Sequence, residues 1–306
     1  MEQSDKKLAS EIQLGAKYLA QSLIPDPGAI PRIPNVDIYG VTVPLNGIAG
    51  GDLITYVNFR ERYDLDARIS RAQAQGQVEV AQKLQKLKRK GGILVADVAG
   101  HEFTNAILAL LLHQMFHTLA LYEMDLSGQI TARLVEQINT RFVKSRTLHK
   151  LTGDPNTTSF ITLIYGEISW TGRFRFIIAG HPQPLVFSKA FDRFVEISQD
   201  RLVSYPPIGL QIDEDNPDAK LYPPPLGYKK LYTVNELNLM GHGDVLLLYS
   251  DGLLDLFSPF GQDHLERAVS RAITGTAKEI CEVILEERKA LAEQTDDLSL
   301  VVIKYQ

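Results

Sequence analysis

Four aspartates in this chain of 306 residues share a local setting that suits the binding of a hard cation. Each lies at the edge of a hydrophobic segment that reads as a β-strand, and glycine adjoins two of them. Mg²⁺ and Mn²⁺ prefer carboxylate oxygens, backbone carbonyls and water, and glycine lets the backbone approach an ion closely. The four are Asp52 in GGD, Asp97 in ADVAGH, Asp251 in SDG and Asp296 in TDDLS.

Each aspartate by itself is better explained as a turn or helix-cap residue, because aspartate is common in both. The four together favour a metal site, since burying several carboxylates near one another is costly unless cations compensate their charge. The chain has one cysteine and no compact Cys/His pattern for zinc. The sequence therefore indicates a divalent cation held by oxygen ligands.

The elements that must position these acids follow from the spacing of apolar residues. Antiparallel strand pairs with helices in separate blocks favour an α+β fold over an alternating β-α-β sheet. A hairpin is expected between the first two strands, 36–41 and 54–57. Further strands are expected at 93–96, 159–169, 173–179, 185–187, 245–249 and 298–303, helices at 5–24, 104–122, 130–143 and 277–293, and a long proline-rich loop at 198–230.

The motifs GGD, DVAGH, AGHPQPL, LLLYSDGLLD and DDLSLVVI occur in this order. This ordered set resembles the SpoIIE-like bacterial branch of the PPM, or type 2C, protein phosphatases, over about Pro34 to Tyr305. The resemblance implies a PPM-type sandwich of two antiparallel β-sheets flanked by helices, preceded by an N-terminal helix. We therefore expect an N-terminal amphipathic helix at 1–26 and a phosphatase domain at 27–306, with a basic helical insertion at about 60–90.

The resemblance also implies a centre of two Mn²⁺ or Mg²⁺ ions and assigns its ligands. Asp97 would bridge both ions, and Asp251 and Asp296 would hold the first. Asp52 and the backbone carbonyl of Val98 would hold the second, largely through water. Asp296 is preferred over its neighbour Asp297 because the family places the ligand three residues before a hydroxyl residue, here Ser299.

A binuclear centre of this kind implies a hydrolytic mechanism. Two ions roughly 3.5–4 Å apart lower the pKa of a shared water, and the activated water attacks phosphorus in line with the leaving seryl or threonyl oxygen. The implied substrate is a phosphoserine or phosphothreonine of a signalling protein, and in this branch often an anti-sigma-factor antagonist. No phosphoenzyme is needed, so Cys281 is predicted to be an inert, packed thiol.

Two histidines lie in motifs near the predicted metal ligands. His101 follows Asp97 by four residues, and His181 follows Ala179-Gly180. Either could orient a phosphate or act as a general acid, and either could instead hydrogen-bond to tighten its loop. We favour the loop-tightening role for His181. Both roles stay open for His101, which we place with Asp97 in the catalytic set.

The chain departs from the family pattern in three places. Glu102 replaces a glycine, and about thirty extra residues separate the first two aspartates. Residues 68–90 carry seven basic residues and one acid, a net +6 that leaves −11 on the rest of a chain whose total is −5. The insertion is either a solvated helical excursion, dispensable for folding, or a docking arm for an acidic partner. The proline-rich loop holds two matches to a family turn, Pro207–Leu210 and Pro225–Tyr228, and the sequence does not choose between them.

Bulk composition limits partners and compartment. The net charge of −5 gives no general attraction for nucleic acid or anionic membrane. The apolar run 106–112 is too short to span a bilayer, and no signal peptide is recognised, so we expect a cytoplasmic protein without a membrane partner. A single cysteine fits a reducing compartment.

The N-terminal helix carries an apolar stripe that must be covered. It docks either on its own catalytic domain or on the same helix of a second chain, and the resemblance favours a homodimer. The stripe consists of Leu8, Ile12, Ala16, Leu19 and Leu23.

Two other functions are compatible with these residues. A catalytically weak PPM-like module could bind a signalling partner without turnover, and Glu102 keeps this alternative open. A two-metal nuclease is disfavoured, because basic residues are not in excess outside 68–90.

Overall fold

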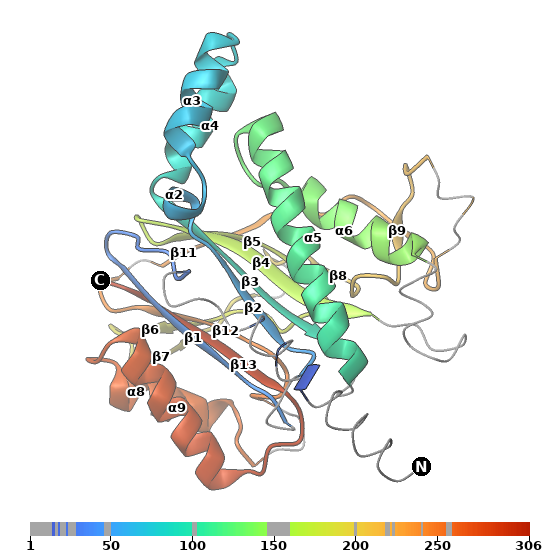
Figure 1. Ribbon diagram of the computed structural model, residues 1–306. Coiled ribbons are helices and arrows are strands. Elements are labelled where there is room, and N and C mark those ends of the chain that lie inside the picture. Colours follow the sequence, from blue (N-terminus) through green and yellow to red (C-terminus); the bar gives the residue numbers. More distant parts are fainter. Residues whose placement is uncertain are drawn as a thin grey trace.

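Two β-sheets lie face to face between two helical layers (Figure 1). The computed structural model describes residues 14, 15, 18, 23, 29–45, 50–99, 103–145, 160–198, 201–217, 221, 224–239, 241–254 and 259–306. The predicted α+β sandwich of antiparallel sheets is confirmed within this part of the chain.

The first sheet has five antiparallel strands in the order β1-β13-β12-β6-β7. Strand β13 lies between β1 and β12, so the C-terminal strand is buried on both edges. The bounds are β1 Val36–Val43, β6 Leu185–Ser188, β7 Arg193–Val195, β12 Val245–Tyr249 and β13 Leu298–Tyr305.

The second sheet has the order β11-β5-β4-β3-β2, and a short strand β8 pairs in parallel with β5. A separate two-stranded pair, β9 with β10, lies in the proline-rich region. The bounds are β2 Leu53–Val57, β3 Lys90–Val98, β4 Ile161–Ser169, β5 Arg173–Ala179, β8 Ser204–Tyr205, β9 Ile212–Asp213, β10 Tyr228–Lys229 and β11 Asn235–Asn238.

Three apolar cores hold the layers together, because successive side chains of a strand point to opposite faces. In β3, Ile93 and Val95 pack between the two sheets, whereas Leu94 and Ala96 pack under the helices α5 and α6. The third core lies between the first sheet and helices α8 and α9. The helices are α2 Phe59–Arg62, α3 Leu65–Ala74, α4 Val78–Leu87, α5 Phe103–Ser127, α6 Ala132–Lys144, α8 Gln262–Ala272 and α9 Ala277–Leu291.

Helix α5 is the one described helix that is long and apolar enough to cross a membrane by length and composition. Half of its apolar window is buried inside the protein, and Leu108, Leu112 and Phe116 belong to the core beneath the second sheet. The predicted buried helix at 104–122 is thus confirmed as a core helix.

The predicted hairpin between 36–41 and 54–57 is wrong. Strand β1 pairs with β13, and β2 pairs with β3, so the two segments belong to different sheets. Local alternation cannot reveal this, since it fixes which face a strand buries and not which strand it pairs with. The sequence also missed α8, β7 and β11, and it treated as loop the segment that contains β8, β9 and β10.

The insertion at 60–90 interrupts the β2–β3 hairpin and is helical, as predicted. The part of the insertion nearest to β2 and β3, its base, is buried and not exposed to solvent as the first alternative expected. Leu65, Leu84 and Leu87 are at most 3% exposed and belong to the core under α5. This burial argues against the expectation that the whole insertion is dispensable for folding, because its removal would take three leucines out of the core.

Of the two proline turns, Pro207–Leu210 is the one that is buried in the core, whereas Pro225–Tyr228 is held by hydrogen bonds at the surface. Ile208 is fully buried and bridges to Ile161, and the Gly209 amide donates to Asn139 Oδ1 at 2.9 Å. At the second turn, a Cβ added to Gly227 would meet no atom within 4 Å.

Of the predicted N-terminal helix, Leu14, Gly15, Tyr18 and Leu23 are described and helical, and Leu23 packs against the α5 core. The other stripe residues lie outside the described part of the chain.

His117 on α5 gives a measurable pH dependence of stability. Burial, and then the nearby charge of Arg62, lowers its pKa to about 3. Above the unfolded pKa of about 6.5 both states are neutral. Below it the unfolded chain binds a proton that the folded chain does not, so stability falls as the pH falls.

We expect the free energy of unfolding to fall by about 2 kcal/mol, because of His117 alone, when the pH is lowered from 7.5 to 5.0. Urea unfolding of the wild type and of His117→Leu at both pH values measures this. The variant should lose about 2 kcal/mol less than the wild type. An equal loss in both proteins would assign the dependence to other groups.

Candidate metal centre

The four predicted acidic ligands lie where strands of both sheets begin or end. Asp52 precedes β2 and Asp97 is the penultimate residue of β3, and pairing of Leu53 with Ala96 makes them neighbours. Asp251 follows β12 and Asp296 precedes β13, which are also paired. The antiparallel register therefore brings each pair of acids to one strand edge.

Ser250 joins the two sheets at this end. Its Oγ donates to Asp52 Oδ2 at 2.7 Å and accepts from the Ser299 amide at 2.8 Å. The Ser250 amide in turn donates to the Ser299 carbonyl at 3.0 Å. Because Asp52 belongs to the second sheet and both serines to the first, this buried network holds Asp52 in the layer between the sheets.

Asp297 fixes the Gly-Gly-Asp turn rather than projecting into solvent. It is 3% exposed, and its carboxylate accepts hydrogen bonds from the amides of Leu45 at 2.8 Å and Gly51 at 2.6 Å. A Cβ on Gly50 would lie 2.2 Å from the same carboxylate, so that position needs glycine. This geometry supports the assignment of Asp296, and not Asp297, as the candidate ligand.

A second set of contacts brings the Asp251 turn against Asp296. A Cβ on Gly252 would lie 2.0 Å from the Asp297 carbonyl oxygen and 3.5 Å from the Asp296 Cβ. Buried Arg288 of α9 donates to the Gly252 carbonyl at 3.2 Å, and Gln294 donates to the Asp296 carbonyl at 2.8 Å. The two candidate ligands are thus fixed through backbone contacts.

The electrostatics at Asp52 fit a bound cation. Burial, followed by the nearby charge of Asp97, raises the pKa of Asp52 well above its usual value. Its Oδ1 atom is buried without a hydrogen-bond partner in the described part of the chain. A buried carboxylate oxygen with no donor, beside a second carboxylate, suits a hard cation such as Mg²⁺ or Mn²⁺.

The described side chains do not form a complete metal cage. Among them, no group of three histidine, cysteine, aspartate or glutamate side chains converges on one point. Val98, whose carbonyl is the predicted fifth ligand, is tied to the turn before Asp52 through its amide, which donates to the Gly51 carbonyl at 3.2 Å. His101 and Glu102 lie outside the described residues, so the role of each stays a prediction.

His181 is buried at the same end of the sandwich. Its Nδ1 lies 2.8 Å from the Thr162 hydroxyl, and Thr162 pairs with Asp97 across β3 and β4. Burial lowers the pKa of His181 to about 3, which keeps the ring neutral. These contacts agree with the loop-tightening role.

Cys281 is also fully buried, and burial raises the pKa of its thiol to about 12, as expected of an inert thiol.

The sequence reasoning missed the serine and threonine contributions. Ser250 was recognised only as part of the Ser-Asp-Gly motif, and Thr162 not at all. A hydroxyl that faces the layer between the sheets could have been found at Ser250 from strand alternation, because Leu246 and Leu248 face that layer.

A family model for stage II sporulation protein E, SpoIIE, matches residues 88–306. The chain belongs to the SpoIIE family. It is accordingly a phosphatase domain of the metal-dependent PPM, or PP2C-like, class, as the resemblance implied. The matched region includes Asp97, Asp251 and Asp296 and begins after most of the basic insertion. A comparison with proteins of curated function finds no significant match.

Several solved structures have the same fold. The SiaA-PP2C domain of Pseudomonas aeruginosa aligns over 100% of both chains with a TM-score of 0.64 and 13% identity. The RsbU and RsbW domains of Rv1364c from Mycobacterium tuberculosis align over 91% of this chain with a TM-score of 0.61 and 18% identity, and this chain spans 63% of that one. A crystal structure of RsbX in complex with magnesium aligns over 90% of this chain and 98% of RsbX, with a TM-score of 0.52 and 11% identity. At these identities the likeness shows the fold.

Proposed function

We propose that this SpoIIE-family domain hydrolyses phosphoserine or phosphothreonine on a signalling protein at the Asp52 end of the sandwich. The observation that carries the proposal is the buried Ser250–Asp52 hydrogen bond, which joins the residue before β2 to the residue before Asp251. The proposed metal ligands are Asp52, Asp97, Asp251, Asp296 and the carbonyl of Val98, around two Mn²⁺ or Mg²⁺ ions.

Divalent ions at such a site supply charge neutralisation for a phosphoryl group and acidify water. The chain's own residues orient the ligands. Ser250 holds one oxygen of Asp52 and leaves the other available, and Asp297 fixes the turn that carries Asp52. Asp97 would be a ligand of the ions, and His101 is proposed to orient the phosphate or to protonate the leaving oxygen.

The substrate class follows from the family and is a proposal for this chain. A phosphorylated protein, of the anti-sigma-factor antagonist kind, fits a SpoIIE-family domain that resembles the RsbU-containing chain. A cytoplasmic location is supported by the lone, buried cysteine. The division into a helix at 1–26 and a domain at 27–306, and dimerisation through that helix, stay predictions.

Metal removal tests the proposed chemistry directly. The full chain should hydrolyse p-nitrophenyl phosphate with Mn²⁺, lose that activity in excess chelator and regain it when Mn²⁺ is restored. It should also release phosphate from a phosphoserine peptide under the same conditions.

Turnover that persists in chelator would overturn the metal assignment. A correctly folded chain without turnover in Mn²⁺ or Mg²⁺ would favour the alternative of a catalytically weak module that binds its partner. Far-ultraviolet circular dichroism of each sample serves as the folding control.

A further inference from the structure

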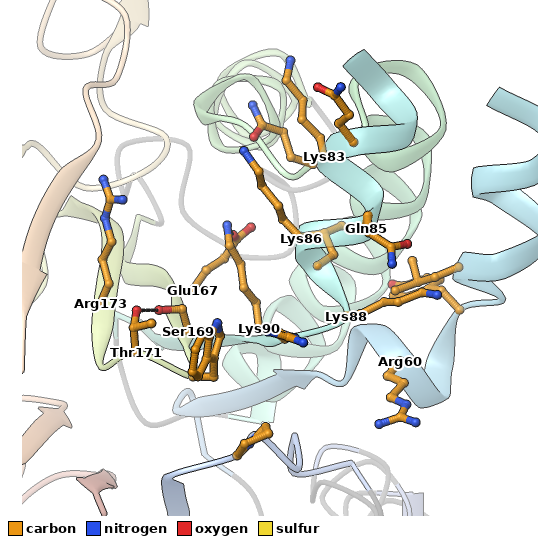
Figure 2. Close-up of a pocket in the computed structure, with 18 of the residues that line it drawn as sticks. Arg60, Lys83, Gln85, Lys86, Lys88, Lys90, Glu167, Ser169, Thr171 and Arg173 are labelled. Carbon is orange, nitrogen blue, oxygen red and sulfur yellow. Dashed lines mark hydrogen bonds and ion pairs between the residues drawn. The ribbon is translucent and has the colours of Figure 1, made fainter. Parts of the chain in front are cut away.

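A cavity of about 1110 Å³ lies far from the proposed metal centre. Its walls are helix α4 on one side and the turn between β4 and β5 on the other, with the start of β3 between them (Figure 2). Lys90 at the start of β3 borders the cavity, whereas Asp97 near the end of β3 belongs to the candidate centre. At about 3.3 Å per strand residue the two positions are about 23 Å apart.

The cavity is strongly basic. Nine basic and three acidic side chains line it. Two of the acids already have partners, since Lys88 pairs with Asp66 at 2.5 Å and Lys90 pairs with Glu167 at 2.9 Å. The positive charge of the remaining lining residues is therefore largely uncompensated.

Lys83 and Lys86 carry the clearest excess charge. Both extend from α4 on the cavity side, as Figure 2 shows, and neither forms an ion pair with any described residue. Across the cavity, Arg173 and Arg175 share the single carboxylate of Glu236. Basic side chains of α4 and of β5 thus line the same cavity from opposite walls.

The walls are connected to each other. The guanidinium of Arg89 lies 5.2 Å from the ring centroid of Trp170, and the Trp170 amide donates to the Arg89 carbonyl at 3.1 Å. Trp170 is 40% exposed at the rim. Because the leucines at the base of α4 are packed in the core, the cavity is held open by fixed elements, and not by a loose arm.

The chemistry of the lining favours carboxylates over a compact polyphosphate. Phosphate cradles use glycine-rich backbone or open helix N-termini. No glycine is among the described lining residues, and the N-terminus of α3 is capped by its own Asp64, whose carboxylate accepts from the Ala67 amide at 2.9 Å. Separated lysines act as hydrated point charges, which suits carboxylates spread along a chain.

The charge of the whole molecule disfavours nucleic acid. Residues 68–90 carry +6 and the rest of the chain carries −11. A long polyanion would meet repulsion as soon as it extended beyond the cavity, whereas a short acidic peptide segment would not.

We propose that this cavity docks an acidic segment, rich in aspartate and glutamate, of a protein partner. The segment lies between α4 and the β4–β5 turn, with its carboxylates on Lys83, Lys86 and Arg173. The site is separate from the candidate metal centre, so the proposal stands whether or not hydrolysis is demonstrated.

Binding of a fluorescein-labelled octaglutamate peptide to the full chain tests the proposal by fluorescence anisotropy. We expect saturable binding at low salt that weakens as salt is added, and at least about tenfold weaker binding to Lys83→Glu with Lys86→Glu. The neutralising pair Lys83→Gln with Lys86→Gln should give an intermediate loss. The matched control, Arg267→Glu with Lys278→Glu on α8 and α9, makes the same change in net charge and should stay within twofold of wild type.

Three outcomes would overturn the proposal. The first is that the wild type does not bind the peptide. The second is that the control variant and the cavity variant lose the same amount of affinity. The third is that the wild type binds tripolyphosphate but not the peptide. Thermal unfolding of each variant shows whether it is folded. If the charge-reversed pair unfolds, the glutamine pair decides the question.

Discussion

Asp97→Asn and Asp251→Asn should each lower Mn²⁺-dependent phosphatase activity on the order of 10³-fold while the fold stays intact. An amide has nearly the shape of a carboxylate but lacks its charge, so it removes a metal ligand at little steric cost. Asp97 comes from the second sheet and Asp251 follows β12 of the first, so the two variants test both sides of the proposed centre. Steady-state hydrolysis of p-nitrophenyl phosphate across a Mn²⁺ titration measures the effect.

Asp297→Asn is the matched comparison. Its carboxylate accepts hydrogen bonds from two amides and fixes the Asp52 turn, so the loss should be smaller and should come with lower thermal stability. Wild-type turnover by either the Asp97 or the Asp251 variant would remove that residue from the site. A larger loss of activity in the Asp297 variant, at unchanged stability, would move the ligand role to Asp297.

Gly252→Ala should destabilise the protein by more than about 3 kcal/mol and abolish activity with it. The added Cβ would lie 2.0 Å from the Asp297 carbonyl oxygen and 3.0 Å from its carbonyl carbon. Both are backbone atoms, so no side chain can rotate away and the turn must move. The movement would separate Asp251 from Asp296 and disturb the Arg288 contact with the Gly252 carbonyl.

Gly261→Ala provides the control for this prediction. A Cβ at Gly261 would meet no atom within 4 Å, and its φ of −99° is accessible to alanine. Only a weak cap at the start of α8 is lost, at a cost of about 1 kcal/mol or less. Denaturant unfolding and activity of both variants settle the matter. Similar stability of Gly252→Ala and wild type would mean that the turn is looser than its contacts indicate.

Much of the fold could be predicted from local patterns. Strands β3 and β12 contain continuous apolar runs, β4, β5 and β13 are rich in β-branched, aromatic and leucine residues, and α5, α6 and α9 have clear helical spacing. Helix α8 was missed although Leu265, Ala268 and Val269 have the i, i+3, i+4 spacing of an amphipathic helix, because this apolar set is short and lies among charged residues. The ordered motifs were enough to identify the family, as the match over residues 88–306 confirms.

Pairing between distant segments could not be predicted. Strand β1 looked like one half of a hairpin with β2, but its partner is β13, more than 250 residues away. The basic insertion likewise looked like a charged helical excursion, and only packing against α5 shows that its base belongs to the core. The same packing fixes α4 as one wall of the basic cavity.

The residue types alone determined that this protein offers carboxylates at strand edges, a basic insertion and an inert cysteine, because charge, hydrogen-bonding capacity and apolar periodicity are properties of the sequence. Only the tertiary structure decided that Ser250 and Asp52 meet across two sheets, that Asp297 fixes a turn, and that Lys83 and Lys86 face Arg173 across a cavity. Such contacts join residues from about 90 to nearly 250 positions apart in the chain. Their geometry depends on how the layers pack, which no local pattern encodes.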